Sequence, residues 1–374
     1  MKAKTFLWIT MGCALSMAAT SRLWPQIQPK TNTLAKGETR PKFKAIWEPV
    51  NYQEDVELMD MAFVSDLEGW VAGGASVLKG GVILHTTDGG DHWTLQLGDP
   101  KSADRAYRSL RFVDAKHGWA VQGTSSKANL LGTTDGERWA PVGTIAENYV
   151  DYAFTTPTSG VYLAKNQIFQ TADGGHTWRS VAACQAKVEV NGLTRNVGCE
   201  FAALHFPSPQ VGYAVAFSYQ VRDVFFVLKT QDGGATWSTA VIPHSEGAHD
   251  VSFTSESVGY ARTGAPDTGK LVGTADGGQT WSGIAGSPGA RIKFAGTNLG
   301  WAFLYRKLGY TTDGGRRWTS REFAFPASVE TFSLPSTQRG YVAGKHGMVY
   351  RYRIVPIGYT AKGMMEAPFM TAPN

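Results

Sequence analysis

One short pattern, Thr-x-Asp-Gly-Gly-x-x-Trp, recurs along this chain and limits the folds that are open to it. An Asp in a turn accepts hydrogen bonds from backbone N–H groups a few residues later, and the glycines supply positive φ angles. The Trp begins the next strand and offers a large apolar surface for packing. We therefore interpret each copy, called a box below, as a turn that staples two strands. The six boxes are Asp88/Trp93, Asp135/Trp139 (one residue shorter), Asp173/Trp178, Asp232/Trp237, Asp276/Trp281 and Asp313/Trp318.

A second pattern occurs seven times: an apolar residue is followed six positions later by Gly, and in six copies the next residue is aromatic. Copies lie 40 to 52 residues apart, a length that accommodates four short strands. Four strands make one blade of a β-propeller, and repeats of this length are typical of that architecture. The sequence therefore predicts an all-β fold, a seven-bladed β-propeller of four-stranded blades. The seven pairs are Phe63/Gly69, Phe112/Gly118, Phe154/Gly160, Phe206/Gly212, Phe253/Gly259, Phe294/Gly300 and Leu334/Gly340.

The last blade lacks a box, and the opposite end of the chain offers the missing strand. Residues 45–50, Ala-Ile-Trp-Glu-Pro-Val, are similar to the segments that follow the boxes, such as Trp139-Ala-Pro-Val. We expect this N-terminal strand to complete the seventh blade, with Trp47 in place of the seventh box Trp. Such closure removes an exposed sheet edge, which otherwise favours aggregation.

The N-terminus has the features of an export signal. Lys2 and Lys4 precede a mostly apolar stretch, residues 6–19, and Ser16-Met17-Ala18 is a small-x-small cleavage site. We predict a signal peptide at 1–18, a flexible spacer at 19–42, the propeller at 43–354 and a C-terminal tail at 355–374. The expected location is the periplasm or the thylakoid lumen, with peripheral membrane association left open. An uncleaved anchor and a lipid on Cys13 are the alternatives, although Thr10 and Met11 fit a lipobox poorly.

Two cysteines remain after the signal, Cys184 and Cys199, and in an exported chain they indicate a disulfide. They lie in the one long insertion between a box and the next blade, and Asn191-Gly192 within it is a hairpin turn signal. We predict a hairpin closed by this disulfide. The formal charge is only +5 and no dense basic run occurs, which argues against a nucleic-acid partner.

The two patterns together resemble the photosystem II stability/assembly factor family, within the wider Asp-box propellers. The resemblance covers about residues 43–354 and is closest at Trp47-Glu-Pro-Val, Glu68-Gly-Trp-Val-Ala-Gly and Thr86-Thr-Asp-Gly-Gly. It implies an exported, monomeric, non-catalytic factor without a cofactor, which binds a protein partner such as a subunit of a membrane complex.

The runner-up function is an exported glycoside hydrolase of the sialidase-like Asp-box class. Paired acids are the minimum for that chemistry, and the loop candidates are Asp99, Asp104, Glu246 and Asp250. The start sequence expected of a sialidase is absent before the first box. Residues 244–250, His-Ser-Glu-Gly-Ala-His-Asp, are the one cluster that resembles metal ligands, but a solvated polar loop is the better interpretation, because metal sites need fixed geometry.

Binding residues concentrate on loops held by a rigid scaffold. In a four-stranded blade the box joins strands three and four, so the loops between blades and between strands two and three emerge on the opposite face. The longest segments, among them 95–109, 179–203 and 216–224, belong to that face. Its candidate partner residues are Arg105, Arg108, Arg195, Arg222, Arg306 and Lys307.

Overall fold

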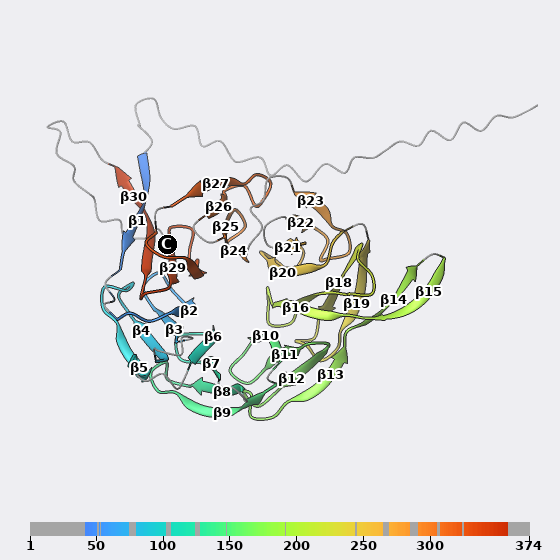
Figure 1. Ribbon diagram of the computed structural model, residues 1–374, viewed down its shortest axis with the longest axis horizontal. Helices are drawn as coiled ribbons and strands as arrows, with labels where there is room; N and C mark the ends of the chain where they lie inside the picture. The colour runs from blue at the N-terminus through green and yellow to red at the C-terminus, as the bar shows by residue number, and fades with distance from the viewer. Residues whose placement is uncertain are drawn as a thin grey trace, which may run out of the picture. The chain divides into compact units, whose positions relative to one another are not determined.

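Seven four-stranded antiparallel sheets form the blades of a β-propeller, which confirms the predicted fold (Figure 1). The computed structural model describes residues 42–50, 52, 54–74, 80–101, 106–123, 128–146, 148–190, 192–243, 245–264, 269–284, 291–304, 307–323 and 325–357. The predicted signal peptide, spacer and most of the tail lie outside these ranges. None of the described segments forms a helix long and apolar enough to cross a membrane.

Each of the first six blades takes four successive strands, and its first strand is the innermost. Blades 1 to 3 are β2 (Leu58–Phe63), β3 (Gly69–Gly73), β4 (Val82–Thr86), β5 (Thr94–Gly98); β6 (Ala106–Phe112), β7 (Gly118–Gly123), β8 (Ala128–Thr133), β9 (Ala140–Ile145); and β10 (Tyr149–Phe154), β11 (Gly160–Ala164), β12 (Gln167–Thr171), β13 (Arg179–Ala183). Blades 4 to 6 are β16 (Glu200–His205), β17 (Gly212–Phe217), β18 (Val224–Thr230), β19 (Ser238–Pro243); β20 (Ala248–Phe253), β21 (Gly259–Thr263), β22 (Lys270–Thr274), β23 (Ser282–Ile284); and β24 (Arg291–Ala295), β25 (Leu299–Leu304), β26 (Lys307–Thr311), β27 (Thr319–Glu322).

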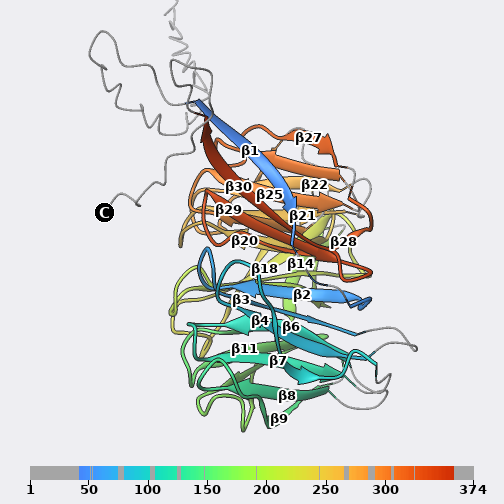
Figure 2. The ribbon, with the colours of Figure 1, turned by 90° about the vertical axis from the view of Figure 1, so that its left-hand side faces the viewer.

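The seventh blade joins the two ends of the propeller. Its strands run in the order β1 (Lys42–Pro49), β30 (Val349–Ile357), β29 (Arg339–Gly344), β28 (Val329–Ser333), so the N-terminal strand is its outermost member. The expected closure is therefore confirmed. Figure 2 shows β1 lying alongside β30, with the blades seen edge on.

Trp47 anchors the closing strand in an aromatic cluster. Its half-buried ring lies 5.2 Å from the ring centre of Trp301 in blade 6 and 5.3 Å from that of Tyr352 in blade 7. Phe323 and Phe325, which follow the outer strand of blade 6, lie at 5.6 and 5.4 Å. Trp47 therefore joins blade 6 to blade 7 as well as completing its own sheet.

The spacing of apolar residue and Gly has a steric cause. A Cβ added at Gly69 would lie 2.4 Å from the Phe63 ring, and the glycines of blades 2 to 6 meet their own Phe in the same way. The φ angles of these glycines are not positive, so backbone conformation does not require glycine here. The reason for glycine is the close approach of the ring, which leaves no room for a Cβ. In each of these blades the Phe ring therefore lies flat on the neighbouring strand.

At five of the seven junctions between blades, the aromatic residue after the Gly stacks on the Phe of the following blade. Trp119 lies 3.6 Å from Phe154, and Tyr213 lies 3.6 Å from Phe253, with nearly parallel rings. The ring centres of Tyr341 and Phe63 are also 3.6 Å apart, so the same contact joins the last blade to the first. This inter-blade role was not predicted from the sequence, although the pattern itself was.

Candidate functional site

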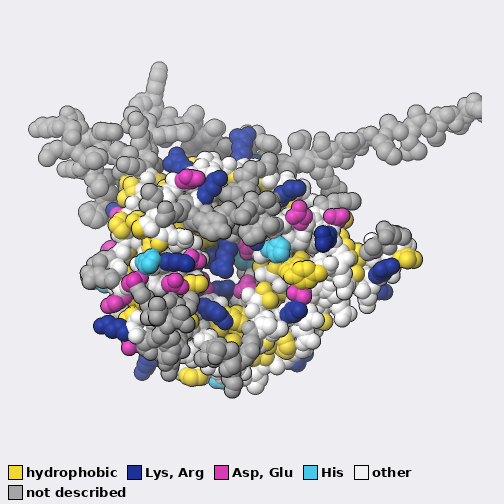
Figure 3. Space-filling model, viewed as in Figure 1, with side chains coloured by type: hydrophobic (Ala, Val, Ile, Leu, Met, Phe, Trp, Pro, Cys, Tyr) yellow, Lys and Arg dark blue, Asp and Glu magenta, His cyan; other side chains and the backbone are white. Residues whose placement is uncertain are grey.

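Two faces can carry function. The boxes and the connections between the first and second strands lie on one face, called the box face. The connections between the second and third strands and between blades emerge on the other, called the loop face, as the antiparallel sheet order requires. In the space-filling view of one face, positive and negative side chains are interspersed around the centre (Figure 3).

The innermost strands carry charged groups that join neighbouring blades. Arg111 of blade 2 lies 2.8 Å from Asp151 of blade 3 and 3.3 Å from Asp60 of blade 1. Its Nε also donates to the carbonyl oxygen of Tyr152 at 3.1 Å. Burial alone would lower the pKa of Arg111, but the two carboxylates raise it, so the guanidinium stays charged. The arginine thus holds three blades together.

Two further inner-strand groups bind the backbone of the next blade. His205 Nδ1 accepts a hydrogen bond from the Phe253 N–H at 3.2 Å, and burial lowers the pKa of this imidazole to about 4. Lys293 Nζ donates to the Phe332 carbonyl oxygen at 2.6 Å, and burial lowers its pKa as well. These contacts indicate structural roles for both side chains.

Asp250, an acid considered for glycoside hydrolysis, is engaged in the same manner. Its two oxygens accept from the N–H groups of Ile292, at 2.8 Å, and Val251, at 3.0 Å. Burial raises the pKa of Asp250 to about 6, although these bonds and nearby arginines oppose the rise. The pKa suits a general acid, but both oxygens are occupied by backbone donors.

The other acid candidates lie apart along the fold. Asp99 follows β5 of blade 1 and accepts from the Lys101 N–H at 2.9 Å, whereas Glu246 precedes β20 of blade 5. Asp104 and His244 lie outside the described residues. Within the described ranges, no group of three His, Cys, Asp or Glu side chains is arranged to hold a metal ion.

Every box lies between the third and fourth strands of its blade and is internally hydrogen-bonded. In the fourth blade Thr230 Oγ1 donates to Asp232 Oδ1 at 2.8 Å and accepts from the Gly234 N–H at 2.9 Å. Asp232 also accepts from the backbone and hydroxyl of Thr236, at 2.9 and 2.6 Å. The hydroxyl of Thr236 and its N–H together lower the pKa of Asp232 to about 2. The two glycines, Gly233 and Gly234, have positive φ angles of 68° and 95°.

The remaining boxes repeat this geometry with small changes. Asp88, Asp135, Asp173, Asp276 and Asp313 each accept from the preceding Thr hydroxyl at 2.7–3.2 Å. Trp178, Trp237, Trp281 and Trp318 donate to a glycine carbonyl of their own box, whereas Trp139 donates to Gln96. Trp93 Nε1 is the exception, a buried donor with no acceptor in the described part of the chain. These carboxylates are committed to their turns, which leaves them poorly placed for substrate.

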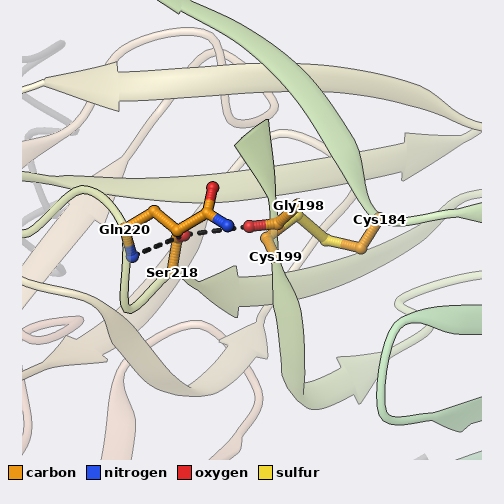
Figure 4. The surroundings of a disulfide bond; sticks show 5 residues. All are labelled: Cys184, Gly198, Cys199, Ser218 and Gln220. Carbon is orange, nitrogen blue, oxygen red and sulfur yellow. Dashed lines mark hydrogen bonds between the residues drawn. A yellow bond between two sulfur atoms is a disulfide. The ribbon is translucent and has the colours of Figure 1, made fainter. Parts of the chain in front are cut away.

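The insertion between blades 3 and 4 is a two-stranded hairpin, β14 (Gln185–Val190) and β15 (Leu193–Gly198). The predicted disulfide, Cys184–Cys199, lies at its base, where both cysteines are buried (Figure 4). Ala186, Val188 and Val197 are also buried, in the apolar core that blades 3 and 4 share. The hairpin is thus packed along one side, which the sequence pattern did not predict.

The four candidate basic residues that the structure describes lie on separate elements of the loop face. Arg108 in blade 2 donates to the Tyr149 hydroxyl at 3.2 Å. Arg195 lies in β15 opposite Val188, Arg222 in the β17–β18 connection and Lys307 at the start of β26. These last three are exposed and form no ion pair within the described ranges. Arg105 and Arg306 lie outside the described residues.

Comparisons with known proteins establish the fold alone, because the similar solved structures share at most 20% of their residues with this chain. No family model matches the chain. No curated protein matches it either. A solved structure described as YCF48 bound to D1 peptide is 20% identical, with a TM-score of 0.60 over 82% of this chain and 94% of that chain. YCF48 from Cyanidioschyzon merolae is 16% identical, with a TM-score of 0.61 over 82% and 98%. The WD40 β-propeller domain of Doa1 is 9% identical, with a TM-score of 0.57 over 84% and 97%.

Proposed function

We propose that this chain is a non-catalytic binding propeller that holds a segment of a membrane-complex subunit, as a photosystem II assembly factor does. The observation that carries the proposal is the likeness to YCF48 in a structure with a bound D1 peptide, which extends over 94% of that chain. The patterns around Trp47, Trp70 and the first box, which resemble the same family, support it independently.

The chemistry of the described residues supports binding over catalysis. Asp250, His205 and Lys293, three inner-strand groups whose pKa values are shifted by burial, each bond to the backbone of an adjacent blade. On the loop face, by contrast, exposed arginines such as Arg195 and Arg222 have no partner in the described ranges. Free guanidinium groups on a rigid scaffold are suited to carboxylates and backbone carbonyls of a protein partner.

The proposed working place is outside the cytosol, in the periplasm or thylakoid lumen. The buried disulfide between Cys184 and Cys199 supports this location, because such bonds persist in oxidising compartments. The export signal predicted at residues 1–18 is in keeping with it.

Affinity purification of the exported, tagged protein from its native membrane fraction tests the proposal. Recovery of photosystem subunits, together with direct binding of a labelled D1 peptide measured by fluorescence anisotropy, is the expected result. Arg222→Glu on the loop face should weaken peptide binding, whereas Arg317→Glu, an exposed arginine of the box face, should not. Turnover of a sialoside without peptide binding would instead establish the hydrolase alternative.

A further inference from the structure

The hairpin β14–β15 has one backbone edge whose direction is fixed by two hydrogen bonds. The Cys199 N–H donates to the Cys184 carbonyl oxygen at 3.1 Å, whereas the Cys184 N–H donates outside the hairpin, to the Asn166 carbonyl oxygen at 2.8 Å. Bonded and non-bonded pairs alternate along an antiparallel ladder, and Cys184 and Cys199 therefore belong to the bonded set. On β15 the residues of the other set, Thr194, Asn196 and Gly198, direct their N–H and C=O groups away from β14.

An observed contact agrees with this assignment. The carbonyl oxygen of Gly198 accepts a hydrogen bond from Ser218 Oγ, in the β17–β18 connection, at 2.9 Å (Figure 4). Further along the edge, the backbone groups of Thr194 and Asn196 bond to nothing in the described part of the chain. An unpaired strand edge of this kind is a template for another strand.

The edge is held rigidly in place. The disulfide closes the base of the hairpin, and Val188 and Val197 are only 5% and 4% exposed, packed into the core that blades 3 and 4 share. The strand therefore needs no ordering before it binds, which reduces the entropic cost of association.

Open edges also occur on the outer strand of each blade, so openness alone does not distinguish β15. The side chains at its ends do. Leu193, at the turn end, is 59% exposed, and Tyr219, beside the Ser218–Gly198 contact, is 78% exposed. They are the two most exposed large apolar side chains among the described residues. Apolar side chains left in water at both ends of a free edge indicate an interaction site.

Two arginines without an ion pair lie near this edge, among exposed acidic side chains such as Glu189, opposite Thr194 on β14. Arg195 lies between the two apolar ends of β15, and Arg222 lies in the same connection as Tyr219. Both are exposed and free of ion pairs within the described ranges. The matching occupant is an extended peptide segment with apolar side chains and at least one carboxylate.

We propose that β15 binds such a segment of the protein partner as a third strand of the hairpin sheet. The inference rests on the proposed function, since it assigns part of the partner site. Main-chain bonds to Thr194 and Asn196 supply the affinity, and Leu193, Tyr219 and Arg195 select the side chains, as in other cases of strand addition.

Overlapping synthetic peptides that cover D1 serve as the probe, with the full exported chain as receptor. Asn196→Pro removes an outward-facing N–H and adds a ring on the open edge, without breaking a bond to β14. We expect it to weaken binding about tenfold or more, while Asn196→Ala stays within about twofold of wild type. Thr194→Pro repeats the test at the second outward-facing residue, and thermal melting checks that both proline variants are folded.

Amide hydrogen exchange on the wild-type complex gives a readout that needs no variant. Bound peptide should slow exchange at Thr194 and Asn196 selectively. Equal peptide binding by wild type and both folded proline variants, or protection confined to other strands, overturns the edge assignment and leaves the proposed function standing. Failure of the wild type to bind any D1 peptide overturns both.

Discussion

Trp47 provides the sharpest test of how the ring is closed. Its indole lies between blade 6 and blade 7 and has five aromatic neighbours, the nearest of them Trp301 at 5.2 Å. Burial of roughly 150 Å² of this partly buried indole corresponds to almost 4 kcal/mol at ~25 cal/mol/Å². The cavity left by truncation adds to that loss, so Trp47→Ala should lower the free energy of unfolding by about 3–5 kcal/mol.

Urea unfolding followed by circular dichroism measures the effect, provided that wild type and variant unfold reversibly with the same slope. Ala45→Ser is the matched control, because Ala45 is an exposed residue of the same strand and its replacement should change stability little. Trp47→Phe, which keeps an aromatic ring, should lie between control and truncation. A loss below about 1 kcal/mol for Trp47→Ala would mean that the closing strand is dispensable, and the argument for closure through its packing would fail.

Three other predictions concern the box, the inner strands and the hairpin. Asp232→Ala should destabilise the fold by about 1–2 kcal/mol in thermal or urea unfolding, because two Thr236 donors and one Thr230 donor lose their acceptor. The affinity of the folded protein for its partner should be unchanged. Weakened binding without a loss of stability would indicate that the box is a functional site. The pKa of His205 is lowered to about 4 in the fold against about 6.5 in the unfolded chain, so its contribution to stability falls as the pH falls through this window. Between pH 7 and pH 4.5 the free energy of unfolding of His205→Gln should therefore fall by about 2–3 kcal/mol less than that of the wild type. Parallel pH profiles of the two proteins would refute a buried neutral imidazole. Reduction of Cys184–Cys199 should speed amide exchange in β14 and β15 while the main melting transition stays within a few degrees, and two free thiols by mass spectrometry before reduction would show that the bond does not form in the exported protein.

His205 and Asp250 affect acid stability in opposite directions. The pKa of Asp250 is raised to about 6, so the folded state binds the proton more readily and gains stability as pH falls from about 6 towards about 4. Over nearly the same range the neutral imidazole of His205 costs stability. The wild type can therefore show a flat profile, and only the comparison with His205→Gln separates the two groups.

The blades and their closure could be predicted from the sequence because the same local sequence patterns recur from blade to blade. The box indicates the turn between the third and fourth strands, and Phe and Gly at a spacing of six indicate the first two strands and the turn between them. The strand Ala45–Val50 was recognisable because it is similar to the strands after the boxes. Likewise, Asn191-Gly192 between two cysteines was sufficient for the hairpin.

The contacts between blades were not predictable in the same way. Asp60, Arg111 and Asp151 meet across three blades, yet they are separated by 40 or more residues and no local pattern links them. A weaker signal does exist, since Asp60, Asp151 and Asp250 each precede the Phe of their blade by three positions. The strand register is irregular there, and each Asp accepts the next backbone N–H of its own strand.

The stacked rings and the inner-strand charges together leave the loop face as the place where we propose that the partner is recognised. Each blade must pack against its neighbour, and charged side chains of the innermost strands take part in that packing. Arg111 and Asp250, for example, bond to the backbone of the next blade and are therefore not free to react. The boxes are likewise committed to their own turns. What varies from blade to blade is the connections on the loop face, and the longest described one carries the hairpin. Since the ring does not require β15 for its closure, the exposed Leu193 and the open edge beside it have no structural reason to face water, and a partner strand supplies one.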